Sequence, residues 1–222
     1  MSQAPPPRSE EELVRRARAL AGWTVGEIAG AHGVALPADT TRAKGLVGQL
    51  AERALGASAG SLDEPDFVAL GIELKTLPVR PDGRPKESTF VCSIRLADLP
   101  DTDFEDSLVW KKLRRVLFVP VEADPALPLP ARRFGAPLLW SPSSEERAVL
   151  QADYERVATL VLRGEVEQLT GHLGTYLQVR PKAADSRARR RAPDADDGFI
   201  WTGPRGFYLR TRFTARILAG LR

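Results

Sequence analysis

Residues 65–77 read PDFVALGIELKTL and combine acidic and basic residues at a spacing typical of a β-strand. Side chains two positions apart on a strand project to the same face, so Glu73 and Lys75 point together and Leu74 points to the other face. Asp66 follows a proline just upstream, where its carboxylate can converge with that of Glu73. A bare E-x-K spacing is more often a surface ion pair, and the upstream aspartate is what favours a functional site.

Two converging carboxylates suit a hard cation that prefers oxygen ligands. Together with the backbone carbonyl of Leu74, Asp66 and Glu73 predict a Mg²⁺ site. Such a cation polarises a phosphate and lowers the pKa of a bound water, while Lys75 can orient that water or stabilise the developing charge. Glu52, on a predicted helix upstream, is either a third carboxylate of this site or an exposed helix residue.

The composition predicts a globular chain. It has 222 residues, of which 43% are hydrophobic and 27% are charged, enough to bury a substantial core. The single cysteine, Cys92, excludes an intramolecular disulfide and a cysteine-rich zinc site. The sequence shows neither a secretory signal nor about 20 consecutive apolar residues, so we expect a soluble, cytoplasmic protein without a membrane span.

Positive charge gathers toward the C-terminal end. The segment Arg180–Arg222 holds eleven Lys and Arg residues against four Asp, a local balance of +7, so the preceding residues sum to −4. A basic segment beside acidic residues suits a protein that attracts phosphates and also holds a cation. An ordinary solvated basic surface would explain the charge equally well.

The remaining patterns predict a mixture of helices and strands. Capping-box spacings at Ser9/Glu12 and Thr24/Glu27 indicate two N-terminal helices, and an apolar stripe indicates a third helix over 44–55. Further along, we predict an antiparallel pair of 71–77 with 88–96 across the turn 81–85, and a strand at 115–121 after a charged helix. Irregular chain follows at 120–142, and then two helices at 144–162 and 165–173. The end of the chain is predicted to hold a strand at 176–179, a mobile loop at 183–197, a hairpin around 203–206 and a last helix from Thr214. The fold class expected from these elements is α/β, a mixed sheet flanked by helices.

Ordered blocks along nearly the whole chain resemble one family. The blocks are Lys44-Gly45, Glu52 with 55–61, Asp66-Phe67, 69–76, 83–85, 89–92, Lys112-Leu113, 115–117, 137–142, 180–184 and 204–209. They are similar to the MutH family, nicking endonucleases of methyl-directed mismatch repair within the PD-(D/E)xK group. A single PD…ExK pattern is weak evidence, but a chance match of this many blocks in order is not credible.

This resemblance implies a fold and an activity. The fold would be restriction endonuclease-like, a single domain over 1–222 with two lobes around a DNA-binding cleft. The catalytic lobe would lie mainly within 1–120 and the DNA-recognition lobe mainly within 121–222. The implied enzyme is a monomer that uses Mg²⁺ to nick the unmethylated strand of hemimethylated GATC sites, activated by MutL after MutS has found a mismatch.

The resemblance also implies roles for individual residues. The catalytic residues would be Asp66, Glu73 and Lys75, with Glu52 as an auxiliary acid. The metal would be held by Asp66, Glu73 and Leu74. The residues in contact with DNA would be Lys44, Lys112, Arg180, Lys182 and Tyr208. Arg180, Lys182 and Tyr208 match the region where the site sequence and its adenine methylation are sensed. Ordinary structural roles compete here, because strand positions such as Tyr208 and Phe90 are more often core, and Lys182 is more often a solvated loop charge.

The chain departs from the family pattern within 185–197, where Arg189, Arg190 and Arg191 make the segment more basic. Our hypothesis is that this run adds sequence-independent phosphate contacts. Two other functions stay open from the sequence. One is a related restriction endonuclease that cuts both strands without MutL, and the other is a catalytically silent DNA-binding protein.

Overall fold

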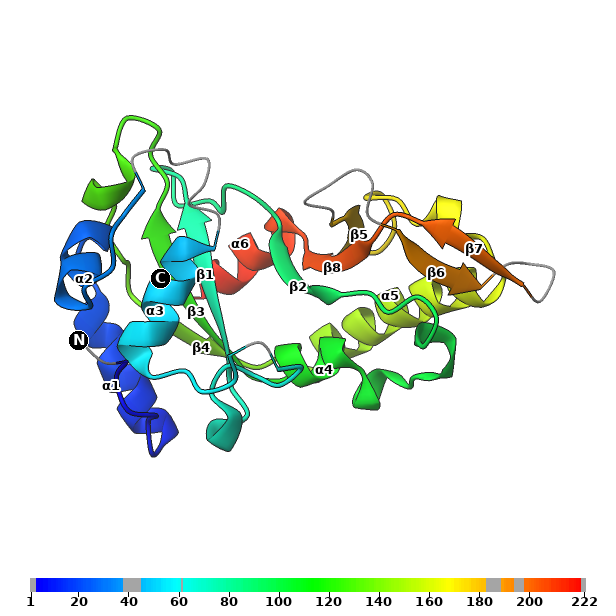
Figure 1. Cartoon of the computed structure of the whole chain (residues 1–222), viewed down its shortest axis with the longest axis horizontal. Coiled ribbons are helices and arrows are strands. Elements are labelled where there is room, and N and C mark those ends of the chain that lie inside the picture. The colour runs from blue at the N-terminus through cyan, green and yellow to red at the C-terminus, as the bar shows by residue number, and fades with distance from the viewer. Residues whose placement is uncertain (1–2, 38–44, 61, 183–188, 194–197, 221–222) are drawn as a thin grey trace. The chain divides into compact units, whose positions relative to one another are not determined.

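The computed structural model describes residues 3–37, 45–60, 62–182, 189–193 and 198–220. It has the mixed α/β character predicted from the sequence, and the chain forms two compact units (Figure 1). Unit 1 comprises Met1–Glu87, Arg114–Ser141 and Ile217–Arg222, and unit 2 comprises Ser88–Leu113 and Pro142–Arg216. Among the described residues, no helix combines the length and apolar character needed to cross a membrane.

Unit 1 contains three helices and a three-stranded mixed sheet among its described residues. The helices are α1 (Glu10–Leu20), α2 (Val25–Ala31) and α3 (Leu46–Leu55), and the strands are β1 (Glu73–Val79), β3 (Val116–Glu122) and β4 (Leu138–Trp140), with 3-10 turns at Val68–Leu70 and Leu129–Ala131. The strand order is β1-β3-β4, in which β1 and β3 are parallel and β4 is antiparallel to β3. β1 is therefore an edge strand of this sheet.

Local sequence signals set the helix ends in unit 1. Thr24 and Glu27 form the predicted reciprocal capping box. Ser9 caps α1 by accepting from the Glu12 N–H, but the Glu12 carboxylate accepts from the Arg8 N–H instead of completing the box. At the end of α3, Gly56 has a left-handed φ of 82°, and an added Cβ would lie 2.3 Å from the Pro5 carbonyl oxygen, so this stop requires glycine.

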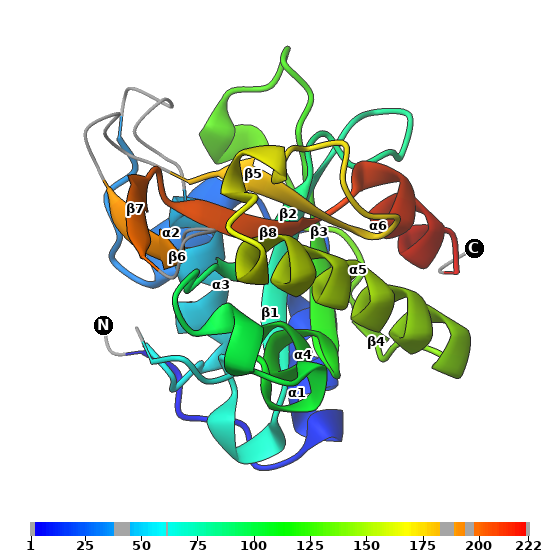
Figure 2. The same ribbon diagram turned by 90° about the vertical axis from the view of Figure 1, so that its right-hand side faces the viewer.

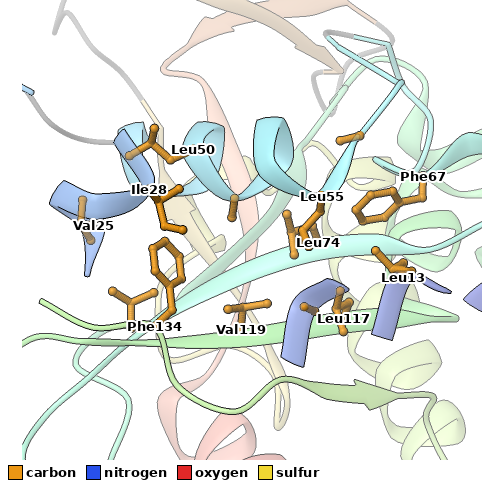
Figure 3. Close-up of a cluster of buried hydrophobic side chains, with 14 of the residues drawn as sticks. Leu13, Val25, Ile28, Leu50, Leu55, Phe67, Leu74, Leu117, Val119 and Phe134 are labelled. Carbon is orange, nitrogen blue, oxygen red and sulfur yellow. The ribbon is translucent and has the colours of Figure 1, made fainter. Parts of the chain in front are cut away.

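The apolar core of unit 1 lies between the helices and one face of the sheet. Figure 3 shows Leu55 of α3 beside Leu74 of β1 and Leu50 of α3 beside Ile28 of α2, in one buried cluster with Leu117 and Val119 of β3. Leu74 is paired in register with Leu117, so both side chains leave the sheet on the same face. Strand alternation consequently turns Glu73 and Lys75 to the opposite face of β1.

The predicted antiparallel pairing of 71–77 with 88–96 is wrong. Across the turn, β1 makes only an isolated bridge between Val79 and Pro85, beside a 2.7 Å bond from the Lys86 N–H to the Pro78 carbonyl. Pro78 and Pro85 have no N–H to donate, so a ladder cannot extend here. β1 pairs instead with the buried strand β3, and β2 (Thr89–Ser93) belongs to unit 2.

Unit 2 combines helices with two antiparallel sheets. Its elements are β2, α4 (Leu108–Leu113), α5 (Ser144–Leu162), β5 (Leu177–Pro181), β6 (Arg190–Pro193), β7 (Phe199–Thr202) and β8 (Arg205–Leu209), with 3-10 turns at Leu99–Asp101, Phe104–Asp106 and Val166–Gln168. The boundary between the units falls inside α6 (Thr211–Ala219). The strand orders are β2-β8-β5 and β6-β7, and Figure 2 shows α5 running beside β5 and β8.

Several predictions for this half of the chain are corrected. Segment 165–173 holds only the 3-10 turn at Val166–Gln168, and Gly164 and Gly174, both with positive φ, flank it. The described part of the predicted loop 183–197 includes strand β6. No hairpin joins β7 to β8 around 203–206, because β7 pairs with β6 and β8 with β2 and β5. The segment 120–142 includes β4, and the last helix begins at Thr211; the predicted helix over 144–162 is confirmed.

A buried carboxylate fixes α5 to the sheet of unit 2. Asp153 is 6% exposed and accepts three backbone N–H bonds, from Thr175 at 2.7 Å, Tyr176 at 2.6 Å and Leu177 at 2.9 Å. These amides lead into β5, so one side chain of α5 sets where that strand begins. Hydrogen bonds to a buried charge are stronger than those between neutral groups.

We expect Asp153→Ala to lower the free energy of unfolding by about 3 kcal/mol, because three buried amides lose their acceptor. Urea denaturation followed by circular dichroism measures the effect. Glu155→Ala is the matched control on the exposed face of α5, where only a surface bond from Gln151 is lost, and its effect should stay within about 0.5 kcal/mol. Equal stability of the two variants would contradict the anchoring role of Asp153.

Candidate active site and DNA-recognition residues

The centre of the candidate active site is a bond between the Asp66 side chain and the backbone of β1. The Leu74 N–H donates to Asp66 Oδ2 at 2.8 Å. The backbone of Asp66 is also held, because its carbonyl accepts from the N–H groups of Ser58 at 2.8 Å and Ala59 at 3.2 Å. The structure thus brings the predicted Asp66 directly to the strand that carries Glu73 and Lys75.

The ladder geometry of β1 explains why this bond forms at Leu74. The Glu73 N–H donates to the Arg115 carbonyl at 3.0 Å, so the backbone groups of Glu73 face β3. In a parallel ladder the next residue turns both its N–H and its C=O away from that partner. The Leu74 carbonyl therefore points to the same open edge at which Leu74 N–H meets the Asp66 carboxylate.

Glu73 and Lys75 form a buried ion pair on one face of β1. Lys75 Nζ lies 2.5 Å from Glu73 Oε1, and the two side chains are only 13% and 2% exposed, respectively. A carboxylate this deeply buried is costly unless a cation compensates its charge. The predicted pair is thus not a solvated surface ion pair, and its two residues flank Leu74, whose N–H donates to the Asp66 carboxylate.

The donor set fits a hard divalent cation. Asp66 and the Leu74 carbonyl offer oxygens at the edge of β1, and Glu73 adds a second carboxylate one residue away. Among the described residues, no group of three or more His, Cys, Asp and Glu side chains is close enough to form a metal cluster. A cation here would rely on two carboxylates, one backbone carbonyl and water, which is the coordination that Mg²⁺ accepts.

Glu52 lies on α3 next to the active-site strand. A Cβ added at Gly48, one helical turn earlier, would lie 3.6 Å from Thr76 Oγ1 and 4.0 Å from Glu52 Oε1. Gly48 thus allows α3 to approach β1 closely, and the half-buried Glu52 side chain follows the same helix stripe. By strand alternation Thr76 leaves β1 on the face opposite to Lys75, so Glu52 approaches from the helix side.

The predicted DNA-recognition residues converge on the sheet of unit 2. Arg180 lies over the Tyr208 ring at 6.0 Å, and Lys182 Nζ lies 3.3 Å from the centre of the Phe90 ring. Phe90 and Tyr208 are opposite each other on β2 and β8 and meet edge to face at 5.3 Å. Phe90 is half-buried rather than core, which corrects the expectation from its strand position.

This cluster occupies the sheet face that α5 does not cover. Phe207, the neighbour of Tyr208 on β8, is buried and contacts Tyr154 of α5 with ring centres 5.8 Å apart. Alternation turns Tyr208 to the opposite face. Gly206 is necessary for this arrangement, because an added Cβ would lie 2.9 Å from the Phe90 ring and 3.2 Å from the Tyr208 ring.

Sequence reasoning missed the partners that orient these cations. Arg180 donates to Ser88 Oγ at 2.8 Å, and Lys182 Nζ lies 3.3 Å from Ser93 Oγ. Ser88, Phe90 and Ser93 flank or form β2, whose pairing with β8 has no local sequence signal. Of the other two lysines predicted to contact DNA, Lys112 is half-buried in the last turn of α4, and Lys44 lies outside the described residues.

Comparisons with known proteins identify the family of this chain. The family model described as DNA mismatch repair enzyme MutH matches residues 55–153. A DNA mismatch repair protein MutH of Klebsiella pneumoniae subsp. pneumoniae is 50% identical, covering 97% of this chain and 94% of the relative. The MutH of Shewanella sp. (strain MR-7) is 47% identical, covering 96% of this chain and 96% of the relative. The MutH of Salmonella paratyphi C is 51% identical, covering 96% of this chain and 93% of the relative. The chain therefore belongs to the MutH family of DNA mismatch repair endonucleases.

Proposed function

We propose that this endonuclease uses Mg²⁺ to nick the unmethylated strand of double-stranded DNA at hemimethylated GATC sites. The observation that carries the proposal is the bond between Asp66 Oδ2 and the Leu74 N–H, which joins the upstream carboxylate to the E-x-K strand. Without that bond, Glu73 and Lys75 would be only a buried ion pair. With it, the Asp66 carboxylate is tied to the same short stretch of β1 that carries the Leu74 carbonyl, Glu73 and Lys75.

Asp66, Glu73 and the Leu74 carbonyl would hold the cation. When bound, Mg²⁺ supplies a Lewis acid for the scissile phosphate and lowers the pKa of a coordinated water. Asp66 is already oriented by the Leu74 N–H, which donates to its Oδ2 at 2.8 Å. Glu52 lies on the α3 side of β1, opposite to the face of Lys75, and its proposed role as an auxiliary acid rests on the family resemblance.

Lys75 would serve the reacting phosphate. Its ammonium is held against Glu73 at 2.5 Å, so its position is defined before DNA binds. A positioned ammonium can orient the attacking water and stabilise negative charge that develops on the phosphorus oxygens. Glu73 thus has two tasks, since it compensates Lys75 and also supplies an oxygen for the metal.

The exposed sheet face of unit 2 would read the DNA site. An arginine can donate two hydrogen bonds to guanine, and lysine contacts guanine acceptors or phosphates. Arg180 and Lys182 present such donors beside the Tyr208 ring, which offers an apolar surface for a base or its methyl group. Lys44 and Lys112, which the family resemblance implies as DNA-contacting residues, would add phosphate contacts.

The same proposal names partners and a place of action. We infer activation by MutL, with MutS acting upstream on the mismatch, because the relatives are named as mismatch repair proteins. We further propose that the enzyme acts as a monomer in the cytoplasm, where bacterial DNA lies. The rival within the same chemistry is a restriction endonuclease that cuts both strands without MutL.

We expect Asp66→Asn to lower the nicking rate by at least about 100-fold and to leave DNA binding unchanged, because the amide keeps an acceptor for Leu74 N–H but loses the charge that holds the cation. Strand-resolved gels measure nicking, and anisotropy with Ca²⁺ measures binding. Asp82→Asn, in the exposed turn where Asp82 Oδ1 accepts from Arg84 N–H at 3.0 Å, should nick normally. Full activity of Asp66→Asn would place the metal elsewhere.

Lys75→Met should destabilise unit 1 by about 3 kcal/mol, because it leaves the buried Glu73 carboxylate uncompensated. Adding Glu73→Gln should restore much of that stability without restoring nicking. Urea denaturation and the nicking assay on the two single variants and the double variant measure both effects. If the double variant is no more stable than Lys75→Met, the ion pair is not what supports Glu73.

Duplexes carrying unmethylated, hemimethylated or fully methylated GATC test the specificity. With Mg²⁺ and MutL, we expect nicking of unmethylated strands only. Either strand of the unmethylated duplex should be nicked, only the unmethylated strand of the hemimethylated duplex should be nicked, and the fully methylated duplex should not be cleaved. Omitting MutL should slow nicking. Cutting both strands of the hemimethylated duplex, or equal rates without MutL, would favour the restriction endonuclease.

A further inference from the structure

An exposed cationic and aromatic face on the β6–β7 ribbon plays no part in the sites described above. Its two large apolar side chains are unusually open, with Phe199 55% and Trp201 69% exposed. Exposed aromatic residues clustered on one face of a soluble protein commonly mark a binding site. Both belong to unit 2, as does Arg191, their neighbour on β6.

Strand register places these side chains on one face. Arg191 is directly opposite Trp201, and Pro193 is directly opposite Phe199. The Arg191 guanidinium also lies over the Phe199 ring at 3.9 Å, a close cation–π contact. The result is one ribbon face that carries an arginine and two aromatic rings.

The opposite face of the ribbon is anchored within unit 2. Ala192 is fully buried and Thr202 is 6% exposed. Arg205, the first residue of β8, donates to Thr202 Oγ1 at 2.6 Å and so ties β7 to the β2-β8-β5 sheet. The aromatic face is therefore carried on a fixed ribbon that continues directly into the strand bearing Tyr208.

Charge alone does not identify the ligand. Arg189, Arg190 and Arg191 are balanced in the sequence by Asp194, Asp196 and Asp197, which lie outside the described residues. A purely electrostatic phosphate site would gain little from such a segment. The open rings are better suited to stacking, with the arginines taking the intervening phosphates.

We propose that the Arg191, Phe199 and Trp201 face binds unpaired DNA without sequence preference, by stacking bases on the rings. A duplex hides the faces of its bases, whereas a single strand or a frayed end beside a nick exposes them. Combined stacking and phosphate contacts are the usual chemistry of single-strand binding. This site is separate from the proposed cleavage and recognition residues and goes beyond the proposed function.

The test is binding of the full chain to a labelled oligothymidylate in EDTA, followed by anisotropy and tryptophan quenching. Trp201→Ala should weaken binding about tenfold, because base–aromatic stacking contributes strongly to affinity. Trp201→Phe should keep most of the affinity and lose the quenching. Trp23→Phe is the matched control, since Trp23 is a 48% exposed tryptophan in unit 1, and it should change neither affinity nor the Trp201 signal.

Two parallel measurements can overturn the proposal. Binding of the corresponding duplex should change less than twofold in Trp201→Ala; an equal loss for duplex and single strand would show a general phosphate contact instead. Unchanged oligothymidylate binding with weaker activation by MutL would assign the face to a protein partner. Because no metal is present, failure of this test is distinguishable from failure of the proposed nicking activity.

Discussion

The bond from the Leu74 N–H to Asp66 Oδ2 is the constraint on which the active-site half of the molecule depends. It uses a backbone group that an edge strand leaves unpaired toward its missing neighbour. A side-chain carboxylate thus takes the place of a further strand. The same contact lies at the edge of the sheet and fixes an acid on the residue that carries the Leu74 carbonyl, so the edge of the sheet and the proposed metal site coincide.

The two faces of β1 have to satisfy opposite demands. Leu74 packs with α3 in the apolar core, while Glu73 is 2% exposed and depends on Lys75 for charge compensation. Burying a carboxylate lowers the stability of the fold, and a strand selected only for packing would carry an apolar residue at this position. A buried acid that keeps its amine partner has a defined position before any ligand arrives, and this preorganisation favours catalysis.

The sequence predicted the parts that depend on neighbours along the chain. The Glu73/Lys75 face follows from strand alternation, the Thr24 helix start from a capping box, and the helix over 144–162 from its pattern. Pairing between distant strands was not predictable, because β1–β3 and β2–β8 contacts join segments separated by about 40 or more residues and leave no local periodicity. The antiparallel pair was wrong for this reason, and so was the core role of Phe90.

The proposed recognition residues show how such long-range pairing brings together side chains that are far apart in the sequence. Lys182 and Phe90 are far apart in the sequence, yet the shared partner strand β8 brings the ammonium over the ring at 3.3 Å. One face of this sheet packs on α5, which Asp153 ties to the start of β5, so the other face is supported by buried structure. A rigid sheet can present cations and rings at fixed spacing, which loops cannot do as accurately. Fixed spacing is what base-edge hydrogen bonds require, since their strength falls steeply with misalignment.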